Sequence, residues 1–148
     1  MPWGIKKRVA IIIGLAFLGF VDAIYLTMDH YLNLPVPCSI VKGCEKVLSS
    51  QYSVMAGIPT SFFGVAYYLV IFVVFVLYLD TRKTQLVYFG SFLTAVGFLA
   101  SIYFVFLQVF ILKAVCLYCL FSASTSTLLF VLGISIILDK VRVKAISG

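Results

Sequence analysis

The sequence predicts an all-α membrane protein, a bundle of four transmembrane helices with one long extracytoplasmic loop. Its 148 residues are 64% hydrophobic and 11% charged, and this charged fraction is well under half of the share of about a quarter that is usual in soluble domains. Four apolar stretches are each long enough to cross about 30 Å of hydrocarbon at about 1.5 Å per residue. We therefore expect the chain to be embedded in a lipid bilayer.

The expected membrane spans belong to one domain, residues 1–148, and are separated by an outer loop at residues 31–58. Basic residues precede the first span, as in a signal peptide, but the apolar stretch continues past the cleavage-like segment at Asp22, so we expect it to remain as a span. The connection between the second and third spans is short, which makes them antiparallel neighbours. The four spans cover approximately residues 9–30, 59–79, 86–112 and 114–138.

The distribution of basic residues sets the expected orientation, because Lys and Arg accumulate on the cytoplasmic side of membrane proteins. Eight of the eleven basic residues lie before the first span, between the second and third, or after the fourth. They form no patch or motif of the kind that binds nucleic acid. Both termini are therefore expected in the cytoplasm, with only Lys42, Lys46 and Lys113 on the other side.

All four cysteines fall on the expected extracytoplasmic side, where disulfides form and persist. Cys38 and Cys44 lie in the outer loop, and Cys116 and Cys119 form a C-x-x-C motif at the start of the fourth span. Residues three apart share a helix face, so this pair can close into a disulfide. The amides at the N-terminus of a helix favour a thiolate and lower the pKa of a nucleophilic cysteine. The arrangement favours thiol–disulfide exchange.

Other readings of the cysteines are weaker. A tetraspan scaffold with two structural disulfides is the main alternative, but a bridge within one helical turn constrains little of the unfolded chain. A four-cysteine zinc site is a second alternative. The two cysteine pairs are loosely spaced for a zinc site, however, and we expect no metal. A small transporter lacks support, because no span is broken and Asp22 is the only interior charge.

Four segments together resemble a known family. The first span ends with Tyr25-Leu26-Thr27 and His30, and the outer loop has a serine, Ser50, after its cysteine Cys44. The second span begins with the segment Ile58 to Gly64, and the fourth begins with Cys116 to Cys119. The chain resembles the vitamin K epoxide reductase family in its prokaryotic, disulfide-forming form. The unrelated four-helix quinone-dependent enzymes carry the C-x-x-C motif in the first outer loop, the reverse of the order found here.

The resemblance implies a role for each cysteine. Cys38 would exchange with a thioredoxin-like extracytoplasmic protein, Cys44 would relay to Cys116, and Cys119 would face a membrane quinone such as ubiquinone, menaquinone or a related molecule. Ser50 would support the quinone reaction. The thioredoxin domain fused to some relatives is absent, so a separate partner is implied.

The chain departs from the vertebrate enzymes of this family at two positions. Ala123 stands where they have a tyrosine, and Thr60 stands where they have an asparagine. Reduction of a quinone is therefore the expected reaction, rather than reduction of an epoxide.

A quinone pocket is expected where the second and fourth spans reach the outer side, with Cys119 about 7–8 Å below the helix start. Hydroxyl groups would bond the quinone carbonyls and aromatic rings would stack against its ring. A pair of phenylalanines at a helix head is, however, also common in lipid contact or in a core. The candidate residues are Thr60, Ser61, Phe62, Phe63 and Tyr118.

Two further features concern the interior of the bundle. An acid within a span costs about 2.5–3.5 kcal/mol to insert, so we expect Asp22 to face inward and bond the hydroxyl cluster that begins at Ser122; a proton relay is the alternative. Small residues on one stripe of the third span let a neighbouring helix approach closely. They are Gly90, Thr94, Gly97 and Ser101.

Overall fold

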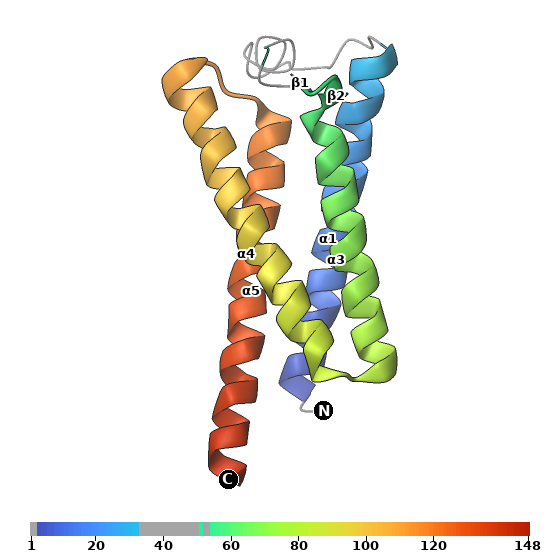
Figure 1. Cartoon of the computed structure of the whole chain (residues 1–148), viewed down its shortest axis with the longest axis vertical. Helices are drawn as coiled ribbons and strands as arrows, with labels where there is room; N and C mark the ends of the chain where they lie inside the picture. Colours follow the sequence, from blue (N-terminus) through green and yellow to red (C-terminus); the bar gives the residue numbers. More distant parts are fainter. Residues whose placement is uncertain (1–2, 33–50, 52–53) are drawn as a thin grey trace.

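A computed structural model describes residues 3–32, 51 and 54–148. It shows long helices that run side by side, with the N- and C-terminal ends of the chain at the same end of the bundle (Figure 1). Within the residues described, four helical segments are long and apolar enough to cross a membrane. The predicted fold class is confirmed. The helices are α1 (Trp3–Leu32), α3 (Thr60–Thr81), α4 (Thr84–Phe106), its π-helical continuation η2 (Leu107–Ile111) and α5 (Leu117–Ser147).

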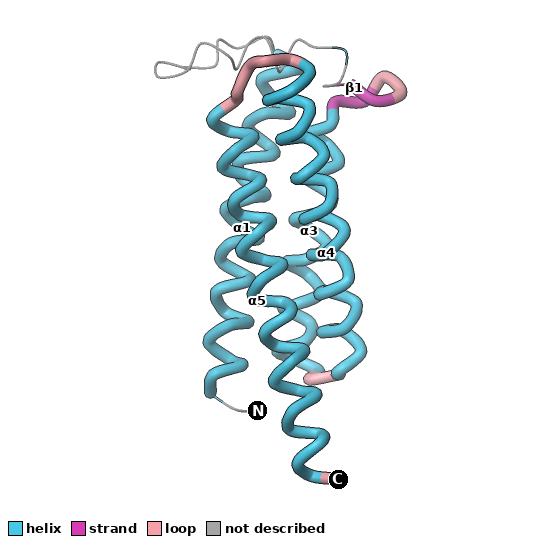
Figure 2. Tube along the Cα trace, turned by 90° about the vertical axis from the view of Figure 1, so that its left-hand side faces the viewer, coloured by secondary structure: helices cyan, strands magenta, loops and turns pink. Residues whose placement is uncertain are grey.

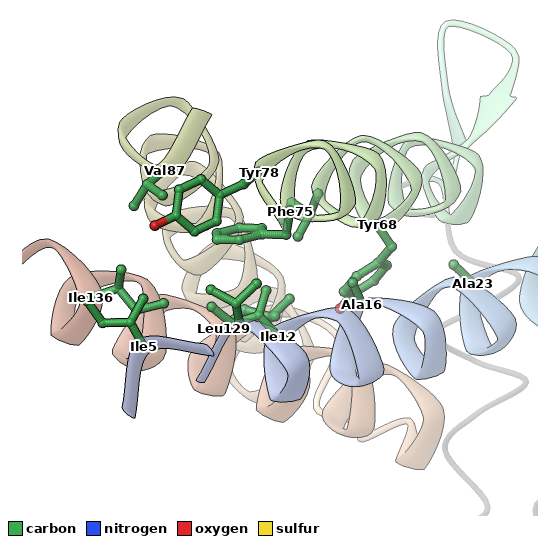
Figure 3. Packing of buried hydrophobic residues seen from close by; sticks show 12 residues of the cluster. Ile5, Ile12, Ala16, Ala23, Tyr68, Phe75, Tyr78, Val87, Leu129 and Ile136 are labelled. Carbon is green, nitrogen blue, oxygen red and sulfur yellow. The ribbon is translucent and has the colours of Figure 1, made fainter. Parts of the chain in front are cut away.

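The four helices form a closed ring in which α1 packs against α3 and α5, and α4 packs against the same two. The tube in Figure 2 shows the helices nearly parallel along the length of the bundle. Apolar side chains from α1, α3, α4 and α5 fill the centre, among them Ile12, Phe75, Val87 and Leu129 (Figure 3). The short connection between α3 and α4 turns at Arg82, which adopts a left-handed conformation with φ 54°.

The helices extend beyond the apolar stretches at the ends of the chain. α1 begins at Trp3 and α5 continues to Ser147, although both terminal segments carry several charges. Hydrophobicity marks where a helix meets lipid and does not determine where its backbone hydrogen bonds stop. The charged ends also interact, since the Arg8 guanidinium forms an ion pair with Asp139 and donates to the Ser135 carbonyl over 3.3 Å.

Two tyrosines on α3 join the helices at mid-bundle. The Tyr68 hydroxyl lies 2.9 Å from both the carbonyl and the hydroxyl of Ser122, and the Tyr67 hydroxyl lies 3.3 Å from the Ser126 hydroxyl. Space for these rings comes from glycines on the facing helices. A Cβ at Gly19 of α1 would overlap the Tyr68 ring, and one at Gly97 of α4 would overlap the Tyr67 hydroxyl.

The small-residue stripe of α4 therefore serves packing, as the sequence predicts. A Cβ at Gly90 would lie 2.8 Å from the Phe75 ring, and Thr94 is fully buried against Gly133 of α5. Close approach of backbones at small residues is the usual way in which membrane helices associate.

A short hairpin precedes α3 and was not anticipated from the sequence. Strand β1 (Val54–Met55) pairs antiparallel with β2 (Ile58–Pro59). Between them Ala56 and Gly57 have φ values of 52° and 82°. Two consecutive left-handed residues are typical of the tightest hairpin turns. The hairpin lies at the same end of the bundle as the start of α5 (Figure 2).

Candidate active site

The candidate site is built on the connection from α4 to α5. The Leu112 amide bonds the Leu107 carbonyl over 2.8 Å, which closes the wide π-type turn of η2. Lys113 then turns the chain in a left-handed conformation, φ 49°, and Cys116 is extended, with φ −100° and ψ 124°. The last helix therefore begins at Leu117 and not near Ala114. Cys119 lies in its first turn, only about 3 Å along the axis, so the expected depth of 7–8 Å was wrong.

The C-x-x-C cysteines lie together at the head of α5. Cys116 is fully buried, whereas Cys119 is half-buried, and both are free thiols. The Cys119 thiol donates a hydrogen bond to the Cys116 sulfur. Leu112, Ala114 and Tyr118 pack around Cys116. The two sulfurs are thus neighbours in an apolar setting, the arrangement that closure into a disulfide requires.

The electrostatics of the site favour the thiolate of Cys116. Its pKa is lowered from 9.0 to about 7, first by the hydrogen bond from the Cys119 thiol and then by the backbone amides of Cys119 and Tyr118. Burial and the charge of Asp22 act in the opposite direction. Cys116 is the N-cap residue of α5, so its thiol lies beside these first-turn amides, which favour its charged form. At neutral pH Cys116 is the more nucleophilic candidate.

Gln108 is a residue of the site that we did not single out from the sequence. It lies in η2, is only 4% exposed, and its side-chain oxygen accepts the Cys116 backbone amide over 3.0 Å. Its own carbonyl accepts the Ala114 amide over 3.0 Å. The available signal was an amide side chain within an apolar span, eight residues before the first cysteine of the motif.

Asp22 faces the site from α1, but its expected partner was wrong. The Ser122 hydroxyl bonds Tyr68 over 2.9 Å, and Oδ2 of Asp22 is buried without a hydrogen-bond partner in the described part of the chain. Tyr68 occupies the Ser122 hydroxyl, and its ring fits between the helices because Gly19 has no side chain. The carboxyl group of Asp22 interacts electrostatically with the thiols of Cys116 and Cys119.

Two of the residues expected to bind a quinone, Ser61 and Tyr118, contact α1. The Tyr118 ring lies 5.5 Å from the Tyr25 ring, centroid to centroid. Ser61 lies 3.0 Å from the Thr27 hydroxyl, and Thr60 is a half-buried residue at the start of α3. Tyr25 and Thr27 both belong to α1, which therefore connects the heads of α3 and α5.

The two phenylalanines at the head of α3 are 48% and 50% exposed, at Phe62 and Phe63 respectively. Among the described residues, neither ring is paired with Tyr118 or with another aromatic ring. Their side chains are accessible from outside the bundle, and the sequence alternative of lipid contact stays open for them. Cys38, Cys44 and Ser50 lie outside the described residues, so their roles stay predictions.

Comparison with known proteins gives the family. The sequence model described as the Vitamin K epoxide reductase family matches residues 10–134, most of the chain and all four helices. The chain belongs to this family. No curated protein sequence matches it. Membership of the vitamin K epoxide reductase family makes the chain a membrane oxidoreductase of a generally quinone-linked kind. Over the described residues, no three His, Cys, Asp or Glu side chains gather into a metal site.

Proposed function

We propose that this protein is a membrane thiol:quinone oxidoreductase that supports disulfide formation. It takes electrons from a reduced thioredoxin-like protein through Cys38 and Cys44, relays them to Cys116 and Cys119, and reduces a membrane quinone. The observation that carries the proposal is the pair of neighbouring free thiols at the head of α5, in which Cys116 is buried and Cys119 packs against it. The Cys119 thiol and the amides of the first turn favour the thiolate of Cys116 and lower its pKa. A purely structural pair has no need of an activated thiolate.

The reaction balances as a chain of two-electron exchanges. The donor dithiol is oxidised to a disulfide as the Cys38–Cys44 disulfide is reduced, and that loop dithiol then reduces the Cys116–Cys119 disulfide. In the last step the Cys116 and Cys119 thiols form their disulfide, and two electrons and two protons pass to the quinone, which becomes a quinol. A thioredoxin-like oxidant can have a potential as high as about −120 mV, so its reoxidation requires a strongly oxidising acceptor such as a quinone.

The quinone is proposed to bind near Cys119, with Ser50 supporting its reaction. The candidates for its binding are Thr60, Ser61, Phe62, Phe63 and Tyr118. Support comes from the hydroxyl of Ser61 and the ring of Tyr118, each held in place by a partner on α1. Ubiquinone, menaquinone and related quinones share the two carbonyl groups that such hydroxyls would bond.

The termini are proposed to lie in the cytoplasm and the cysteines on the outer side. The excess of Lys and Arg at one end of the bundle supports this orientation. Cysteines introduced at Lys113 and Lys83 would test it, since these residues flank α4 at opposite ends. In intact cells a membrane-impermeant maleimide should label Lys113→Cys and leave Lys83→Cys unlabelled, as read at each peptide by mass spectrometry. The reverse pattern would place the site in the cytoplasm.

The alternative is a tetraspan scaffold with structural disulfides, and one assay separates the two. Purified protein is mixed with a reduced thioredoxin-like donor and a soluble quinone, and quinone absorbance is followed. The wild type and Ser91→Ala, a buried polar change on α4 away from the site, should both turn over. Cys116→Ala and Cys119→Ala should be inactive, and Cys119→Ala should accumulate mixed disulfides. A wild type that leaves the quinone oxidised would favour the scaffold.

A further inference from the structure

The π-helical segment η2 turns one polar side chain inward. Gln108 is 4% exposed, whereas the three residues after it, Val109, Phe110 and Ile111, are 47%, 66% and 49% exposed. Short π segments widen a helix by one residue and are frequent at functional sites. Here the widened turn leaves Gln108 in the interior, beside the cysteine motif.

Gln108 holds the connection to α5 at two points. Its backbone carbonyl accepts the amide of Ala114 and its side-chain oxygen accepts the amide of Cys116, each over 3.0 Å. Between these points the chain makes its left-handed turn at Lys113. A buried amide needs a partner, and the amide of a residue that caps a helix has none within that helix. The Gln108 side chain supplies it.

The proposed relay makes a demand on this backbone. The Cys116 thiol must react with a loop cysteine in one step and with Cys119 in the next, and each exchange needs the attacking sulfur aligned with the disulfide. The same thiol depends on the first-turn amides of α5 for its lowered pKa. Both requirements are met if the Cys116 backbone stays fixed and only its side chain rotates.

We propose that Gln108 is a positioning residue that fixes the backbone of Cys116, so that the thiol changes partners by side-chain rotation and keeps its alignment with the start of α5. This inference rests on the proposed function for the exchange steps, but its effect on the thiol is independent of any quinone or protein partner. Gln108 itself exchanges no proton or electron.

The test compares two substitutions of Gln108 in the full-length, fully reduced protein. Gln108→Leu keeps the approximate volume and removes the acceptor, whereas Gln108→Glu keeps an oxygen for the Cys116 amide and adds a charge. The protonation of Cys116 is followed by the Cβ chemical shift of ¹³C-labelled cysteine, which does not depend on access to the buried sulfur. Closure of the Cys116–Cys119 disulfide by the small oxidant diamide is timed at several pH values.

Gln108→Leu should raise the titration midpoint of Cys116 by roughly one unit and slow closure roughly tenfold at neutral pH. Gln108→Glu should also raise the midpoint, but its closure rate should return to within about twofold of the wild-type rate at a pH above that midpoint. A residue with only a structural role would not give this difference between the two pH profiles. If Gln108→Leu fails to fold, Gln108→Asn, whose amide is one carbon shorter, takes its place.

The control is Ser91→Ala, which removes a buried hydrogen bond between α4 and α5 at Gly133, away from the cysteines. It should leave the Cys116 midpoint unchanged. A midpoint and closure rate in Gln108→Leu equal to those of the wild type would overturn the proposal, and so would an equal shift in Ser91→Ala. If the wild type reduces no quinone but Gln108→Leu still shifts the midpoint, the proposed function fails and the positioning role stands.

Discussion

Removing the Cys119 thiol should raise the pKa of Cys116 part of the way back towards that of an ordinary cysteine. Its pKa is lowered from 9.0 to about 7, and the hydrogen bond from Cys119 is the largest cause. At pH 7 a thiol with a pKa of about 7 is about half ionised, whereas one with a pKa of 9.0 is ionised to about 1%. We expect Cys119→Ala to raise the midpoint by at least about one unit, since the α5 amides remain.

The matched control for this experiment is Cys119→Ser, which keeps a hydroxyl donor at the same position and should retain a lowered midpoint. Both variants are titrated in excess reductant by the ¹³C chemical shift of the labelled cysteines, with Cys116→Ser used to assign the Cys116 signal. A midpoint near 7 in Cys119→Ala would refute the reasoning, because it would show that the neighbouring thiol does not stabilise the thiolate. Equal midpoints near 9 in both variants would show that a hydroxyl donor does not replace the thiol.

Asp22→Asn should move the Cys116 midpoint downward, because the charge of Asp22 opposes the thiolate; the same titration checks this, and an unchanged or raised midpoint would contradict it. Gly19→Ala should destabilise the bundle by about 1–3 kcal/mol, since the new Cβ would overlap the Tyr68 ring. Thermal unfolding in detergent measures this loss against Gly14→Ala on the same helix, where a Cβ meets nothing within 4 Å. Equal stability of the two variants would show that the Tyr68 ring can shift without a loss of unfolding free energy.

The sequence was informative about the fold because a bilayer restricts the choices. A backbone in hydrocarbon must satisfy its own hydrogen bonds, so long apolar stretches become helices almost without exception. The helix ends were less predictable, since α1 and α5 continue through charged residues at Lys6 and Lys144. The hairpin at Ala56 and Gly57 was missed because alanine is uncommon in a left-handed turn.

The position of the cysteine pair could be predicted from the sequence, but the residues that contact it could not. The C-x-x-C motif predicts that Cys116 and Cys119 lie together at a helix start, and the structure places both thiols there. Gln108 acts through a π-type turn whose position no hydrophobic pattern indicates. The predicted hydrogen bond between Asp22 and Ser122 was wrong because Tyr68 bonds Ser122 instead. The sequence does not show that this tyrosine extends from α3 to α5.

The balance of charges around Cys116 bears on its reactivity as well as on its ionisation. A thiolate becomes a weaker nucleophile as its pKa falls, so the best attacking thiol has a pKa near the ambient pH. The Cys119 thiol and the amides of α5 lower the pKa of Cys116, whereas burial and Asp22 raise it, and the result is about 7. Asp22 would then limit how far the helix start can lower this pKa. Asp22→Asn should accordingly increase the thiolate fraction below pH 7 while reducing the reactivity of each thiolate.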